Sequence, residues 1–148
     1  MAAPVWPRRM RWTYAGNPLA VAAAHAVLDV IADERLCDRA VEIGETIRAR
    51  LHHIADQQGM ECVGDVRGLG AMNAFELVTD RSGKAPDAPL TSAIVAEAER
   101  RGLILLSCGT RYNVIRLLPP LTIPMDQLAE ALDILEASIE AALMARAA

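Results

Sequence analysis

One arginine stands inside a short apolar segment, Val114 to Leu118. If this segment is a strand, Val114, Arg116 and Leu118 lie on one face and the two residues between them on the other. An unpaired buried charge is costly, so we expect an anionic partner for the guanidinium. Its planar fork matches a carboxylate through two hydrogen bonds, which makes ligand recognition one interpretation of Arg116. A structural ion pair, or an edge strand from which the side chain reaches water, is the alternative.

A second candidate site precedes the first expected helix. The segment Thr13 to Pro18 reads Thr-Tyr-Ala-Gly-Asn-Pro and puts a hydroxyl and backbone amides just ahead of a helix N-terminus. Free N–H groups and the helix dipole both favour an anion, so this segment can hold a phosphate. The alternative is purely structural, with Asn17 as the helix cap and Pro18 as a first-turn residue.

Other polar features favour structural interpretations. Cys108 has no histidine near it in the sequence, so we interpret it as a packing residue and not as a nucleophile. His52 and His53 are adjacent, so a helix turns them about 100° apart and they cannot chelate one metal. The Gly-rich segment Arg67 to Gly70 is typical of a hairpin connection. We therefore expect no catalytic residue and no metal ligand in this chain.

The composition excludes several classes of protein. The chain has 148 residues, of which 53% are hydrophobic, and its formal net charge is −4. This length suits one domain of about 100–150 residues, and the apolar fraction excludes disorder. The negative charge argues against nucleic acid, and no apolar run reaches the roughly 18 residues of a membrane span. Three cysteines without a C-x-x-C pair indicate a reducing compartment, so we expect a cytoplasmic protein.

Hydrophobic periodicity predicts the order α-α-β-β-α-β-β-α. The expected helices, each with an apolar stripe, begin near residue 17, span 36–56 and about 89–101, and begin again near 124; the expected strands are 62–66, 71–77, 103–106 and 114–118. Paired helices and paired strands favour an α+β two-layer sandwich, with a small, mostly antiparallel sheet of about four strands and four helices. Residues 1–12 show neither periodicity, so we expect an unstructured or atypical start followed by one domain, 13–148.

Taken together, four segments resemble a single family. They are Thr13 to Pro18, Val66 to Met72, Gly102 to Thr110 and Asn113 to Thr122, in this order and at this spacing. They are similar to the C-terminal part of class III pyridoxal-phosphate-dependent aminotransferases, closest to the 4-aminobutyrate type. The resemblance implies the small domain of a fold type I transaminase, normally a homodimer in which large and small domains bracket the cofactor.

The resemblance also implies roles for two residues. Thr13 matches the threonine that binds the phosphate of pyridoxal 5'-phosphate, and Arg116 matches the arginine that grips the α-carboxylate of glutamate or 2-oxoglutarate. The implied partners of the intact enzyme are 2-oxoglutarate or glutamate, an ω-amino acid, and a second copy of the chain or a large-domain chain. Nucleic acid and membranes are not among them.

The family's catalytic lysine has no counterpart in this sequence. The large domain that carries it should precede Thr13 by many residues, and only twelve residues do. Lys84 is the single lysine, in a polar loop where the family has no catalytic role. We therefore expect a truncated 4-aminobutyrate-type aminotransferase that does not hold the cofactor covalently, is inactive alone and is active only if complemented. The alternatives are a non-catalytic dimerisation or small-molecule-binding module, and a decaying gene product.

Overall fold

The computed structural model describes residues 16–147, which form four helices and one four-stranded sheet. The helices are α1 (Pro18–Asp33), α2 (Leu36–Asp56), α3 (Ala88–Arg100) and α4 (Met125–Ala147). The strands are β1 (Val63–Leu69), β2 (Met72–Leu77), β3 (Leu106–Cys108) and β4 (Val114–Leu117). This order confirms the one that the periodicity predicts. Within residues 16–147, no helix combines the length and the hydropathy that crossing a membrane requires.

The chain divides into two compact units, Met1–Leu36 and Cys37–Ala148. The described part of the first unit is α1, whose cap is the predicted one: Asn17 Oδ1 accepts a hydrogen bond from the Leu19 N–H at 3.0 Å. The apolar stripe predicted on α1 has no buried residue within this unit, of which α1 is the helix that the structure describes. A single domain over residues 13–148 therefore stays a prediction.

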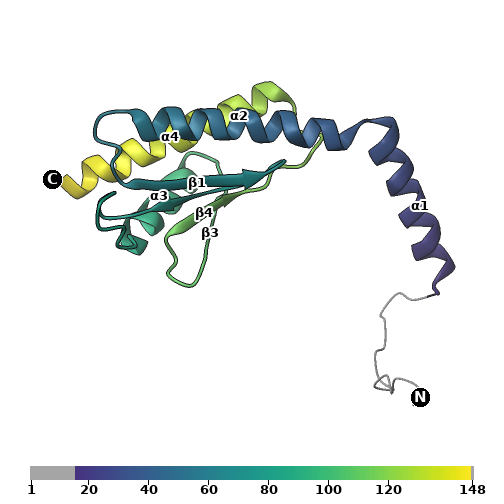
Figure 1. Ribbon diagram of the computed structural model, residues 1–148, viewed down its shortest axis with the longest axis horizontal. Helices are drawn as coiled ribbons and strands as arrows, with labels where there is room; N and C mark the ends of the chain where they lie inside the picture. Colours follow the sequence, from purple (N-terminus) through teal and green to yellow (C-terminus); the bar gives the residue numbers. More distant parts are fainter. Residues whose placement is uncertain (1–15, 148) are drawn as a thin grey trace, which may run out of the picture. The chain divides into compact units, whose positions relative to one another are not determined.

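The sheet of the second unit has the strand order β1-β2-β4-β3, and all neighbours are antiparallel (Figure 1). β1 and β2 form a hairpin in which Leu69 pairs with Met72, so Gly70 and Ala71 make the turn. Gly70 has φ +53°, a left-handed conformation that glycine adopts without strain. The predicted hairpin connection is thus confirmed, although β1 continues into it as far as Leu69.

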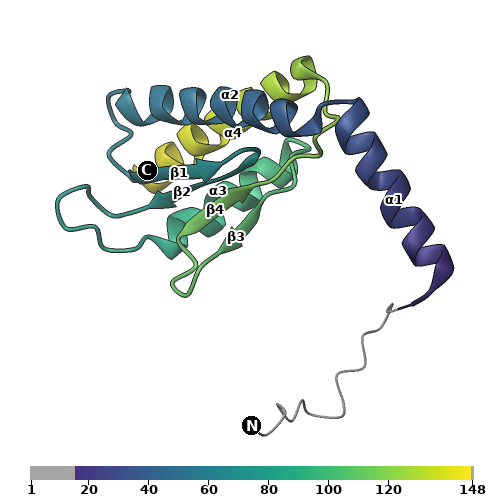
Figure 2. The same cartoon turned by 45° about the vertical axis from the view of Figure 1, so that its right-hand side comes forward.

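Helices α2, α3 and α4 bury their apolar stripes against one face of this sheet (Figure 2). The side chains at the centre of the core are Ile43, Ile47, Leu51, Ile54, Phe75, Ile94, Ile115, Leu135 and Ile139, each at most 1% exposed. α2 and α4 are also joined by polar contacts, since Arg50 Nε donates to Glu136 Oε2 at 2.8 Å. The predicted α+β two-layer arrangement is confirmed, and the opposite face of the sheet carries no helix among the described residues.

α2 lies against the backbone of the β1–β2 turn. A Cβ atom placed on Gly44 would be 1.9 Å from the carbonyl oxygen of Gly70, so only glycine fits at this point of the helix. Arg48 Nη1 donates to Asn73 Oδ1 at 3.0 Å, and Asn73 Nδ2 donates to the same Gly70 oxygen at 3.1 Å. These contacts fix the hairpin, and with it the sheet, on α2.

The third strand is not where the periodicity predicts it. The apolar segment 103–106 was expected to be a strand, whereas β3 is Leu106–Cys108. Leu105 is 6% exposed and belongs to the core, so the apolar residues before β3 are buried by packing without strand pairing. Pairing begins at Leu106, which lies opposite Arg116 of β4.

Candidate functional site

Arg116 projects from the face of the sheet that the helices leave open. Its neighbour Ile115 is fully buried in the core and Arg116 is exposed, as the predicted alternation requires. Val114, predicted on the face of Arg116, is also buried, and β4 ends at Leu117, before Leu118. Arg116 forms no ion pair with any residue that the structure describes. A structural ion pair within residues 16–147 is therefore not the reason for this arginine. Its five N–H donors are available to an external anion.

The sheet places a second arginine in line with Arg116. The register runs from Arg67 of β1 to Ala74 of β2, then to Arg116 of β4 and Leu106 of β3. Arg67 and Arg116 line the same surface hollow, and the small side chain of Ala74 separates them. Two cations therefore share one side of the sheet.

The two arginines differ in their partners. Arg67 Nη1 donates to Asp65 Oδ2 at 2.5 Å, and Arg67 Nη2 lies 2.8 Å from Glu76 Oε1. The hydrogen bonds that the Arg67 guanidinium donates to Asp65 and to Glu76 raise its pKa above the usual value. Arg67 is thus engaged by two carboxylates, and Arg116 is the arginine of this row whose charge is uncompensated.

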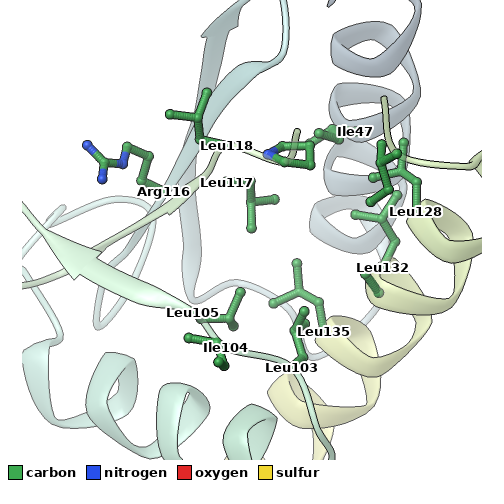
Figure 3. A pocket seen from close by; sticks show the side chains of 13 residues that line it. Ile47, Leu103, Ile104, Leu105, Arg116, Leu117, Leu118, Leu128, Leu132 and Leu135 are labelled. Atoms are coloured by element: carbon green, nitrogen blue, oxygen red, sulfur yellow. The ribbon is translucent and has the colours of Figure 1, made fainter. Parts of the chain in front are cut away.

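Beside Arg116, on the helix side of β4, lies an apolar cavity of about 170 Å³. Its walls include Ile47, Leu103, Leu117, Leu128 and Leu135 (Figure 3). Arg116 stands at the rim, and its guanidinium points away from these leucines (Figure 3). The cavity therefore offers no charged group to a carboxylate, and the anion-binding candidate is the open face, not the cavity.

The other predicted site residue, Thr13, lies outside the described residues. In the part of that segment which the structure describes, the Leu19 and Ala20 amides donate to Asn17 Oδ1. These first-turn donors are thus used by the cap. The role of Thr13 toward a cofactor phosphate stays a prediction.

Lys84, the single lysine of the sequence, lies in the exposed loop between β2 and α3. Pyridoxal chemistry needs an amine held in an enclosed site against the cofactor. An exposed loop does not enclose an amine, so the described residues do not fit the cofactor by themselves. Cys108 is half-buried in β3 as a free thiol, and its interpretation as a packing residue stays a prediction.

Comparison with a family model identifies the protein family of the chain. The model described as aminotransferase class-III matches residues 5–139. The chain belongs to the class III aminotransferases. Membership confirms the resemblance that the four sequence segments carry. Pyridoxal 5'-phosphate is the cofactor of class III aminotransferases, as that resemblance implied.

Curated class III aminotransferases resemble the chain over most of its length. It is 50% identical over 129 residues to 5-aminovalerate aminotransferase DavT of Pseudomonas aeruginosa, covering 87% of this chain and 30% of that protein. It is 48% identical over 131 residues to 4-aminobutyrate aminotransferase GabT of Escherichia coli, covering 88% of this chain and 30% of that protein. The chain thus spans about 30% of the length of these relatives.

Solved transaminase structures share the fold. An aminotransferase of Bacillus anthracis superimposes with a TM-score of 0.77 at 30% identity, over 86% of this chain and 29% of that one. A transaminase of the marine bacterium Virgibacillus gives a TM-score of 0.81 at 26% identity, over 95% of this chain and 32% of that one. The chain therefore has the fold of one part of a class III aminotransferase.

Sequence reasoning did not single out a polar hollow of about 410 Å³ near the ends of β2 and β4. Arg67, Lys84 and Arg111 all line it, from three separate segments of the chain. Spacing along the sequence carries no signal for such a cluster, because the antiparallel pairing of β2 with β4 brings the segments together.

Proposed function

We propose that this chain forms the small-domain part of an aminotransferase that transfers an amino group from an ω-amino acid to 2-oxoglutarate. The observation that carries the proposal is Arg116, an exposed guanidinium without an ion-pair partner in the second unit. The names of the two relatives, a 5-aminovalerate and a 4-aminobutyrate aminotransferase, support a donor whose amine lies at the end of a short carboxylic acid.

In this proposal Arg116 binds and orients the carboxylate of 2-oxoglutarate or glutamate. A guanidinium offers two parallel N–H donors to a carboxylate, which fixes the orientation of the bound acid as well as its position. Such charged hydrogen bonds contribute roughly 1.5–3 kcal/mol. Asp65 and Glu76 engage Arg67, so the neighbouring arginine competes less for the same carboxylate.

We further propose that these 148 residues do not transaminate by themselves. The single lysine is in an exposed loop, and the chain matches about 30% of its relatives. A large domain would supply the lysine, and Thr13 would bind the cofactor phosphate. The exposed apolar side chains beside Arg116, Leu106 at 57% and Leu118 at 58%, are consistent with a face that another domain or a second copy covers. We place this assembly in the cytoplasm, because all three cysteines are free.

A chimera tests the proposal. The matching C-terminal segment of the Escherichia coli 4-aminobutyrate aminotransferase is replaced by this chain, and glutamate formation from 2-oxoglutarate is measured with 4-aminobutyrate or 5-aminovalerate as donor. The isolated chain is assayed in parallel with pyridoxal phosphate, then reduced with borohydride and digested. We expect turnover from the chimera and none from the isolated chain.

Two results would contradict the proposal. One is turnover by the isolated chain together with a pyridoxyl group on Lys84. The other is a chimera that is folded by circular dichroism and binds the cofactor by absorbance, yet forms no glutamate with either donor. A non-catalytic module would give the second result.

A further inference from the structure

The polar hollow near the ends of β2 and β4 has an unusual balance of charge. Arg67, Lys84 and Arg111 line it, and Glu76 is its acidic side chain. Glu76 is already engaged by Arg67, with Oε1 2.8 Å from Nη2. Neither Lys84 nor Arg111 forms an ion pair within residues 16–147. Two uncompensated cations therefore meet in one hollow of a chain whose net charge is −4.

Lys84 is held in place by the loop that carries it. Asp80 Oδ1 accepts hydrogen bonds from the Ser82 hydroxyl and from the Gly83 N–H, both at 2.5 Å. The Lys84 N–H donates to the Asp80 carbonyl oxygen at 3.1 Å, and the backbone of Lys84 has φ +50°. A lysine in this left-handed conformation is uncommon and persists because its surroundings determine it. The side chain that carries the ammonium group therefore extends from a backbone position that these hydrogen bonds fix.

Arg111 is placed by the β3–β4 hairpin. The Tyr112 N–H donates to the Gly109 carbonyl oxygen at 3.3 Å, which closes a tight turn around Thr110 and Arg111. Next to the turn, the buried Asn113 side chain donates to the Leu77 carbonyl oxygen at 3.0 Å and ties the hairpin to β2. The turn therefore presents a cation and a hydroxyl from a defined position toward the loop of Lys84.

We propose that this hollow is an anion-binding site for a small oxyanion of charge −2, a phosphate or dicarboxylate group. Lys84 supplies a compact positive charge, Arg111 supplies a planar fork of donors, and the Thr110 hydroxyl is a neutral donor. Two cations without acidic partners match two negative charges. Arg116 does not line this hollow, which adjoins the hollow of Arg116 and shares Arg67, Gly109 and Val114 with it. The proposed site uses Lys84, Arg111 and Thr110 in place of Arg116 and does not depend on the carboxylate site proposed above.

The binding of inorganic phosphate and of malonate to the 148-residue chain tests this site, by ¹H–¹⁵N NMR titration at constant ionic strength. The variants are Lys84→Met, Arg111→Met and the double variant, with Lys84→Arg as the conservative change. Arg100→Met is the matched control, because Arg100 is an exposed arginine that pairs with Glu97 on α3. Circular dichroism verifies that every variant is folded.

We expect saturable shifts centred on the amides of residues 83–84 and 109–112. Each single variant should weaken binding about tenfold, the double variant should abolish saturation, and Lys84→Arg and Arg100→Met should bind like the parent chain. The probe that binds more tightly identifies the preferred oxyanion. The proposal is overturned if neither probe saturates, if the double variant binds like the parent chain, or if the shifts centre on Arg116 and not on these loops.

Discussion

Arg116 of β4 and Arg67 of β1 stand in one row of the open sheet face, with Ala74 of β2 between them. They have the same side chain and occupy the same face, and only their partners differ. Asp65 and Glu76 engage Arg67, whereas no described carboxylate engages Arg116. The partners, and not the residue type, therefore distinguish Arg67 from Arg116, the arginine that we propose as the carboxylate-binding residue.

This difference predicts that the two arginines contribute unequally to stability. Arg67→Met should lower the free energy of unfolding by roughly 0.5–1 kcal/mol, a value kept small because Arg67 is about half exposed. Arg116→Met should change it by less than about 0.5 kcal/mol, because no partner in the second unit is lost. Urea unfolding monitored by circular dichroism measures both. If Arg116→Met lowers the free energy of unfolding more than Arg67→Met does, Arg116 has a structural role that the described contacts do not contain.

Gly44→Ala should destabilise the protein although alanine favours helices. Helix propensity alone predicts a gain of about 1 kcal/mol. The added Cβ would lie 1.9 Å from the Gly70 carbonyl oxygen, so α2 must move away from the hairpin, at a cost of roughly 1–3 kcal/mol. Ala49→Gly, at an exposed position of the same helix, is the matched control and should lose about 1 kcal/mol through propensity alone. A higher thermal midpoint for Gly44→Ala would show that α2 and the Gly70 carbonyl oxygen are not in close contact.

Arg146→Met should weaken the contact between α3 and α4. Asp87 caps α3 by accepting a hydrogen bond from the Leu90 N–H at 3.1 Å, and its side chain is 4% exposed. Arg146 of α4 is its cationic partner, so the substitution leaves a buried carboxylate with the cap alone. We expect a loss of roughly 1–2 kcal/mol in urea unfolding. Arg100→Met removes an exposed arginine whose partner Glu97 keeps its ion pair with Arg101, so it should lower the free energy of unfolding by less than about 0.5 kcal/mol. Equal losses for Arg146→Met and Arg100→Met would argue against the Asp87 contact.

Cys62 should resist alkylation more than Cys37. Burial raises the pKa of the Cys62 thiol, and the nearby Asp87 and Glu61 carboxylates act in the same direction. The thiolate is the reactive form, so a raised pKa shifts its reaction to higher pH, and burial also restricts access. Cys37 is exposed. Iodoacetamide labelling followed by mass spectrometry between about pH 7 and 9 should modify Cys37 first, and equal rates at neutral pH would contradict the buried environment of Cys62.

Much of the fold follows from local patterns in the sequence. Ile43, Ile47, Leu51 and Ile54 recur at helical spacing, and they are the residues that α2 buries. The alternation around Arg116 likewise predicts which side of β4 faces the core. Such patterns succeed because the spacing of apolar residues directly sets which face of an element is buried.

The sequence-based predictions are wrong or incomplete where contacts between residues distant in sequence determine the structure. An apolar segment signals burial and not pairing, so 103–106 was predicted as a strand, whereas the register with Arg116 begins β3 at Leu106. Lys84 and Arg111 lie at one hollow only because β2 pairs with β4, and no local pattern reports that pairing.

The most direct test of the central claim is the KM for 2-oxoglutarate of the chimeric aminotransferase with Arg116 intact, with Arg116→Lys and with Arg116→Met. Binding of the acid by a guanidinium fork predicts that Arg116→Met raises this KM by roughly 10- to 100-fold. Arg116→Lys should fall between the two, because lysine keeps the charge and loses the fork. A KM that stays the same in Arg116→Met would contradict the claim that Arg116 binds the carboxylate.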